Sequence, residues 1–181
     1  MTALPAHLET SKAIHGAITV SSDQQFYDVA VPDGYAGWYA QLLTTLAVLL
    51  EGEEIVYGYG KSTTGLGAHV TVFATRLVAT AYIEDFTSQD AISVVTATGR
   101  QSITSLEVGA SSRIDAKMSA AYAWPGDLHI VATYPSLEHP VVLVGNSFAH
   151  WEDDNVAPIW RLVSGLKADL QKLHATNTSE Q

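Results

Sequence analysis

One serine in this sequence has neighbours that suit a nucleophile. Ser147 lies in the segment Gly-Asn-Ser-Phe-Ala, which follows the apolar run Val-Val-Leu-Val. The spacing G-x-S-x-G exposes a serine hydroxyl on a tight turn between a strand and a helix. Here Ala149 replaces the second glycine, and Asp169 and His174 fall on or just beyond a predicted helix instead of on later strands. A small serine hydrolase using Ser147 therefore stays an alternative, and we assign no catalytic residue.

A glycine-rich segment, residues 58–65, looks at first like a phosphate-binding loop. It reads Gly-Tyr-Gly-Lys-Ser-Thr-Thr-Gly. The P-loop pattern G-x-x-x-x-G-K-[ST] cradles phosphate with backbone N–H groups at the start of a helix. The position five residues before Gly60 is Ile55 instead of glycine, and the following residues have the pattern of a strand. We therefore interpret this segment as a hairpin loop and expect no nucleotide cofactor.

The residues that could ligate a metal lack the spacing of known sites. The chain has no cysteine, which excludes disulfides and thiolate zinc sites. Its 7 histidines form no H-x-H or H-E-x-x-H pair, and the acidic run at 150–155 lacks the D-x-D-x-D-G spacing of a calcium loop. We interpret that run as the cap of a following helix and predict neither a metal site nor a cofactor.

The charge of the chain argues against anionic partners. There are 19 acidic and 9 basic residues, giving a net charge of −10, and the basic residues are scattered along the sequence. Such a surface repels nucleic acid. The loop 61–67 holds a single lysine, which contributes only about 1 kcal/mol near an anionic membrane. The N-terminus lacks the basic and apolar regions of a secretory signal. We therefore expect no nucleic acid or lipid headgroup as partner, and a cytoplasmic location.

A nearly all-apolar helix is predicted over residues 35–50. Its stripe recurs at steps of four, four and three residues, and other apolar side chains widen it nearly all the way round, so the helix must be covered on more than one side. Burying four such side chains contributes on the order of 6–10 kcal/mol. Either the chain itself or a partner, including a second copy, could supply the cover. The candidate face consists of Trp38, Leu42, Leu46 and Leu49.

About seven short strands follow this helix. After Gly52 the apolar period changes from 3.6 to two, and turn residues separate the runs. Short strands without long helices between them predict an antiparallel sandwich or barrel. The candidate strands are residues 55–59, 69–75, 77–83, 92–98, 102–108, 118–123, 128–134 and 141–144.

An amphipathic helix is predicted over residues 156–173. Its apolar stripe has helical spacing, with Trp160 beside it, and its opposite face is polar. These elements predict a single domain over 35–174, with a partly irregular N-terminal segment, 1–34, and a polar tail, 175–181. The stripe consists of Ile159, Val163, Leu166, Leu170 and Leu173.

Residues 50–173 resemble small bacterial pleckstrin-homology-like (PH-like) domains. Leu-Glu-Gly-Glu-Glu-Ile at 50–55 is similar to the entry to their first strand, Ala-Thr-Arg-Leu-Val at 74–78 to a later turn, and Ile-Thr-Ser-Leu-Glu-Val at 103–108 to the next strand. Trp160 stands where such domains often place an aromatic plug across the open barrel end. The resemblance implies a mainly β (α+β) fold, an antiparallel open barrel or sandwich with an N-terminal helix and a capping C-terminal helix.

The function that the resemblance implies is binding or assembly without catalysis. Together with the apolar helix at 35–50, it predicts a protein-interaction module that associates with itself or with a protein partner. Two alternatives stay open, namely the serine hydrolase using Ser147 and a carrier of a lipid or other apolar ligand.

Overall fold

The computed structural model of the protein describes residues 6–63, 65–87, 94–110, 128–145 and 156–178. It is an α+β protein with two antiparallel sheets. The chain divides into two compact units, Met1–Gly99 and Arg100–Gln181. The boundary falls at the turn between two predicted strands, inside the range that the sequence predicted as a single domain.

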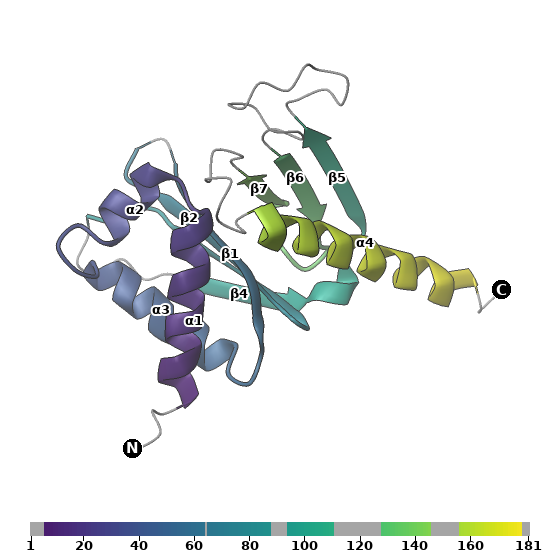
Figure 1. Ribbon diagram of the computed structural model, residues 1–181, viewed down its shortest axis with the longest axis horizontal. Coiled ribbons are helices and arrows are strands. Elements are labelled where there is room, and N and C mark those ends of the chain that lie inside the picture. Colours follow the sequence, from purple (N-terminus) through teal and green to yellow (C-terminus); the bar gives the residue numbers. More distant parts are fainter. Residues whose placement is uncertain (1–5, 64, 88–93, 111–127, 146–155, 179–181) are drawn as a thin grey trace. The chain divides into compact units, whose positions relative to one another are not determined.

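Unit 1 consists of three helices followed by a four-stranded sheet (Figure 1). Each strand pairs antiparallel with the next, so the order in the sheet is β1-β2-β3-β4. The elements are α1 (Ala6–Ser21), α2 (Gln24–Ala30), α3 (Gly37–Leu49), β1 (Ile55–Ser62), β2 (Ala68–Ala74), β3 (Leu77–Ile83) and β4 (Val94–Gly99).

The N-terminal segment is more ordered than the sequence predicted. Residues expected to be partly irregular form α1 and α2, and only the following helix was foreseen. Ile14 and Ile18 lie one turn apart on α1 and are both fully buried. Asp23 begins α2, because its Oδ1 accepts a hydrogen bond of 2.6 Å from the N–H of Phe26. The predicted helix at 35–50 is confirmed as α3.

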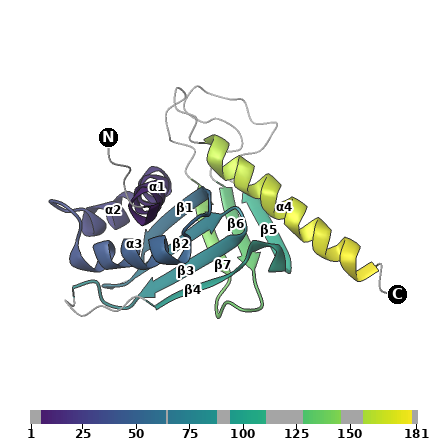
Figure 2. The same ribbon diagram turned by 90° about the horizontal axis from the view of Figure 1, so that it is seen from below.

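The three helices cover one face of the sheet in unit 1 (Figure 2). Alternate residues of the strands point to that face, as the pleat requires. Val70 and Val72 of β2 meet Ala79 and Ala81 of β3 there, and all four are buried against the helices. The interior of unit 1 is therefore a helix-on-sheet core.

Unit 2 consists of a three-stranded antiparallel sheet and one long helix. The strand order is β5-β6-β7, and the predicted helix at 156–173 is confirmed as α4. The predicted strand at 118–123 lies outside the described residues. The elements are the 3-10 helix η1 (Arg100–Ser102), β5 (Ser105–Ala110), β6 (Leu128–Thr133), β7 (Val141–Gly145) and α4 (Val156–Thr178).

Helix α4 packs closely on the last strand of unit 2. A Cβ built at Gly145 of β7 would lie 2.4 Å from Cδ1 of Ile159, so a larger residue there would require the end of the Ile159 side chain to move. Ile159, Leu162 and Leu166 are buried, whereas Trp160 is only partly buried. Of the predicted stripe, Ile159 and Leu166 are therefore buried, whereas Val163, Leu170 and Leu173 are only partly buried.

Candidate interaction surface

The inner face of α3 belongs to the core of unit 1. Trp38 is 6% exposed, and Leu42 and Leu46 are fully buried in the cluster that joins α1, α3 and the sheet. Of the four side chains predicted as a face for a partner or a second copy, only Leu49 is exposed. The chain itself therefore covers the other three, which is the first of the two alternatives that the sequence left open.

The outer face of the same helix carries no charge. The sequence from Gly37 to Leu50 contains no acidic or basic residue. Val48 is 67% exposed, the largest exposed fraction among the bulky apolar side chains of the three helices. Beside it, Thr44 Oγ1 donates a hydrogen bond of 2.9 Å to the carbonyl of Ala40, so this hydroxyl is already satisfied within the helix. The exposed residues of this face are Gln41, Thr44, Thr45, Val48 and Leu49.

Strand β4, which α3 contacts, continues this uncharged region. β4 contains only valine, threonine, alanine and glycine. Val95 and Ala97 point to the face that the helices cover, whereas Val94, which is 70% exposed, points to the opposite face of the sheet. It is the last strand of its sheet, and no strand of the described part of the chain pairs with its outer edge. We define the outer face of α3 together with the outer edge of β4 as the α3–β4 surface.

The opposite edge of the sheet, β1, is covered from within the chain. Helix α1 packs on β1, and the N–H of Gly60 donates a hydrogen bond of 2.7 Å to Ser22 Oγ. Cβ atoms built at Gly58 and Gly60 would lie 2.8 Å from the backbone nitrogen of Ile18 and 2.4 Å from the ring of Phe26. The glycines therefore let the helices approach the strand backbone directly.

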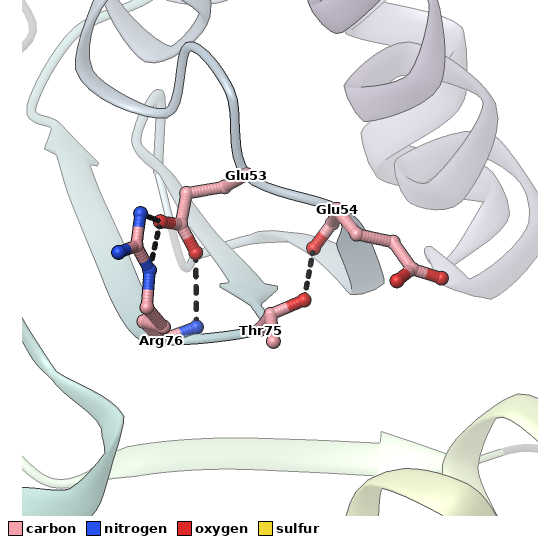
Figure 3. Close-up of polar contacts among 4 residues, drawn as sticks. All are labelled: Glu53, Glu54, Thr75 and Arg76. Atoms are coloured by element: carbon pink, nitrogen blue, oxygen red, sulfur yellow. Dashed lines mark hydrogen bonds and ion pairs between the residues drawn. The ribbon is translucent and has the colours of Figure 1, made fainter.

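A polar cluster joins two of the segments that carry the PH-like resemblance. Figure 3 shows the Glu53 carboxylate between the guanidinium and the backbone N–H of Arg76, with an Nε–Oε1 distance of 2.7 Å and an N–Oε2 distance of 3.0 Å. The N–H of Thr75 donates to the carbonyl of Glu54 at 3.0 Å. The Glu53 side chain is 5% exposed and that of Arg76 is 78% exposed. The cluster ties the entry to β1 to the turn between β2 and β3.

This cluster has the character of a structural clamp. The hydrogen bonds from Arg76 lower the pKa of Glu53, so the carboxylate stays ionised and is poorly suited to accept and release a proton near neutral pH. Both carboxylate oxygens are already occupied by Arg76. We assign it to holding the sheet together.

His15 of α1 contacts Tyr39 of α3 and Tyr35, which precedes that helix. His15 Nδ1 and the hydroxyl of Tyr39 share a hydrogen bond of 3.1 Å, and the ring of His15 lies 4.8 Å from that of Tyr35. Burial lowers the pKa of His15 and raises the pKa of Tyr39. Neutral forms of both side chains are thus favoured, and the contact joins the two helices.

In unit 2 a buried ion pair fixes the position of α4. Arg100 Nε donates to Asp169 Oδ2 at 2.7 Å, and both side chains are largely buried. Burial raises the pKa of Tyr134, which lies close enough to be affected by both charges. Asp169, one of the two residues that a Ser147 triad would need, is therefore engaged by Arg100. Ser147 itself lies outside the described residues.

Within the ranges given above, no three His, Asp or Glu side chains gather as metal ligands. In the same part of the chain, no helix has both the length and the apolar character needed to cross a membrane. Comparisons with protein-family models, curated proteins and solved structures found no match.

Proposed function

We propose that this protein is a non-catalytic assembly module of PH-like type, located in the cytoplasm, that associates with itself through the α3–β4 surface. The observation that carries the proposal is the lack of charge on this surface in a chain with a net charge of −10. Two copies with such a charge repel each other. Two copies can therefore associate more easily through a surface that contains no acidic residues.

The composition of the α3–β4 surface supports contact with another protein. The centres of protein interfaces are depleted of charged residues. Val48 and Leu49 expose apolar area on the outer face of α3. The threonine hydroxyls of α3 need no further partner, because Thr44 and Thr45 donate to carbonyls one turn earlier. Covering this face would therefore leave few polar groups unsatisfied.

The PH-like part of the proposal is supported by the element order. Seven described strands in antiparallel sheets precede a single C-terminal helix, the order on which the resemblance was based. The contact between Glu53 and Arg76 joins two of the segments that carry the resemblance. An assembly role without catalysis is what such domains suggest.

The test is a charge placed on the outer face of α3. Val48→Lys removes exposed apolar area worth at least about 1.5 kcal/mol when buried, so we expect self-association to weaken about tenfold or more. Sedimentation over a concentration series measures it. Val20→Lys is the matched control, because Val20 is a half-exposed valine on α1, which lies against the other edge of the sheet.

The sign of the charge makes this test specific. Each variant adds one positive charge and so reduces the general repulsion between copies equally. If Val48→Lys and Val20→Lys associate alike, the contact does not involve α3. A wild-type chain that stays monomeric over the whole concentration series would overturn the proposed function.

A further inference from the structure

The exposed charges of α4 are all basic, in contrast to the acidic character of the chain. Arg161, Lys167 and Lys172 are exposed on this helix. Its one acidic residue, Asp169, is buried and pairs with Arg100 at 2.7 Å. In a chain with 19 acidic and 9 basic residues, α4 therefore presents a positively charged surface. Such a surface attracts carboxylates.

One side of α4 combines a positive charge with apolar side chains that are only partly buried. Trp160, Val163, Lys167 and Leu170 recur at steps of three, four and three residues, so they lie along one side of the helix. The three apolar side chains are partly buried, and Lys167 is exposed. We define these four residues as the α4 flank.

The C-terminal end of α3 has the complementary character. Val48 and Leu49 expose apolar area there, and the exposed residues Glu51 and Glu54 follow the helix. Figure 3 shows the Glu54 carboxylate pointing away from Arg76, outside the polar clamp. The end of the helix also carries the partial negative charge of the backbone dipole. An ammonium group between apolar side chains fits this end of α3.

We infer that the α4 flank of one copy packs against the C-terminal end of α3 in a second copy, with Lys167 close to the carboxylates of Glu51 and Glu54. This inference rests on the proposed function and names the part of the second copy that covers α3. Charge complementarity identifies a second copy as the occupant, because every copy carries both halves of the contact. Opposite charges across the contact offset the repulsion between two chains with a net charge of −10.

Apolar burial and charge contribute differently to this contact. The exposed apolar side chains of the two helices supply the area removed from water. An exposed ion pair adds little affinity by itself. Charges at the rim of an interface instead raise the association rate and fix the register. Reversing one of these charges is the sharper test, because it replaces an attraction by a repulsion.

Charge reversal at Lys167 tests the α4 side of the contact. Lys167→Glu places a third carboxylate beside Glu51 and Glu54, so we expect self-association to weaken about fivefold or more. Lys12→Glu is the matched control, because it makes the same change of charge at an exposed site on α1. Sedimentation over a concentration series measures association, and far-ultraviolet circular dichroism checks that each variant folds.

Charge reversal at Glu51 tests the α3 side of the contact. Glu51→Lys should also weaken association, although it reduces the net negative charge of each copy. Glu9→Lys makes the same change of charge at an exposed site on α1 and is the control. Association of Glu51→Lys equal to that of Glu9→Lys would contradict the inference.

A mixture of the two reversed variants gives the most specific readout. Lys167→Glu and Glu51→Lys chains again present opposite charges to each other, so an equimolar mixture should recover most of the wild-type association. Raising the NaCl concentration from about 0.05 M to about 0.5 M should reduce the difference between each single variant and the wild type, because salt screens exposed charges. A mixture that associates no better than the separate variants would overturn the inference.

Carbodiimide cross-linking of the wild-type chain locates the contact directly. The reagent joins an ammonium group to a carboxylate where the two lie in contact. In a mixture of isotope-labelled and unlabelled chains, we expect peptides of mixed label that link Lys167 to Glu51 or Glu54. Links confined to peptides of one label would place the contact within a single chain and exclude a second copy as the occupant.

Comparison with Val48→Lys separates this inference from the proposed function. If Val48→Lys weakens self-association but Lys167→Glu behaves like Lys12→Glu, the α4 flank is not the occupant while association through α3 stands. If the wild-type chain stays monomeric over the whole concentration series, both proposals are wrong.

Discussion

The two edge strands of the sheet in unit 1, β1 and β4, differ in their contacts with the rest of the chain. β1 is covered by α1, its glycines admit the helices to the backbone, and Ser22 accepts a hydrogen bond from an outward N–H. β4 keeps a regular, uncharged edge to which no described strand pairs. Both edge strands belong to the same 99 residues.

Because of this difference, we expect substitutions at the two edges to affect different properties, namely the stability of the monomer at β1 and self-association at β4. Contacts at the β1 edge lie within one chain, so substitutions there should lower the free energy of unfolding at any protein concentration. Substitutions at the outer edge of β4 should instead change association and leave the stability of the monomer nearly unaltered, since exposed substitutions usually cost within about 0.5 kcal/mol. The following predictions test the covered edge.

The largest effect is expected at Phe26. Its ring is 1% exposed and packs against the backbone of Gly60 on β1 and the rings of Trp38 and Tyr39. Phe26→Ala should lower the free energy of unfolding by about 3–5 kcal/mol, through lost burial and the cavity left behind. Urea denaturation followed by circular dichroism measures it. Tyr27→Ala, the exposed neighbour, is the control, and an equal loss in the two variants would show that α2 does not seal the edge.

A smaller effect is expected where α1 touches β1. At Gly58 an added Cβ would lie 2.8 Å from the backbone nitrogen of Ile18, so Gly58→Ala must move helix or strand and should cost about 1–3 kcal/mol. Gly16 lies in α1, the helix that also contains Ile18, and a Cβ built at Gly16 would have no neighbour within 4 Å. Gly16→Ala should therefore stabilise by roughly 0.5–1 kcal/mol.

The opposite signs of these two substitutions are the informative result. They make the same chemical change, at Gly16 in a helix with open space at the Cβ position and at Gly58 in a strand with a backbone atom 2.8 Å from it. Chemical denaturation of both variants under one set of conditions measures them. If both substitutions stabilised the protein, α1 would not be in close contact with β1 at Gly58.

The helices and strands whose apolar residues recur at one regular spacing could be predicted from the sequence. The apolar stripes of α3 and α4 and the alternating runs of the strands led to their approximate positions. Two further signals were present but unused: Ile14 and Ile18 have helical spacing, and Asp23 precedes Phe26 at the distance of a helix cap. They would have led to α1 and α2.

The candidate surface could be predicted only in part. The unusual helix was recognised, but its apolar residues continue nearly all the way round, so the sequence could not show which side faces the sheet. The structure places Leu42 inside and Val48 outside. Strand order is not encoded in a local pattern either, because β4 becomes an edge only through the pairing of the three preceding strands.

The smallest expected effect concerns the pH dependence of the helix that covers β1. His15 lies on α1 and contacts Tyr39 of α3, and burial lowers its pKa from the ordinary value of 6.5. As the pH falls below about 6.5, the unfolded chain takes up a proton at His15 more readily than the folded protein. The free energy of unfolding should therefore decrease, until the pH passes below the lowered pKa.

His15→Gln isolates this contribution from the six other histidines. Glutamine keeps a side chain that can bond to Tyr39 but does not titrate. Urea denaturation at several pH values between about 7.5 and 5 should show a smaller loss of stability in the variant than in the wild type. A wild-type protein that gains stability relative to the variant on acidification would mean that His15 is charged in the folded state, and that the contact between α1 and α3 is held by a charge instead of by burial.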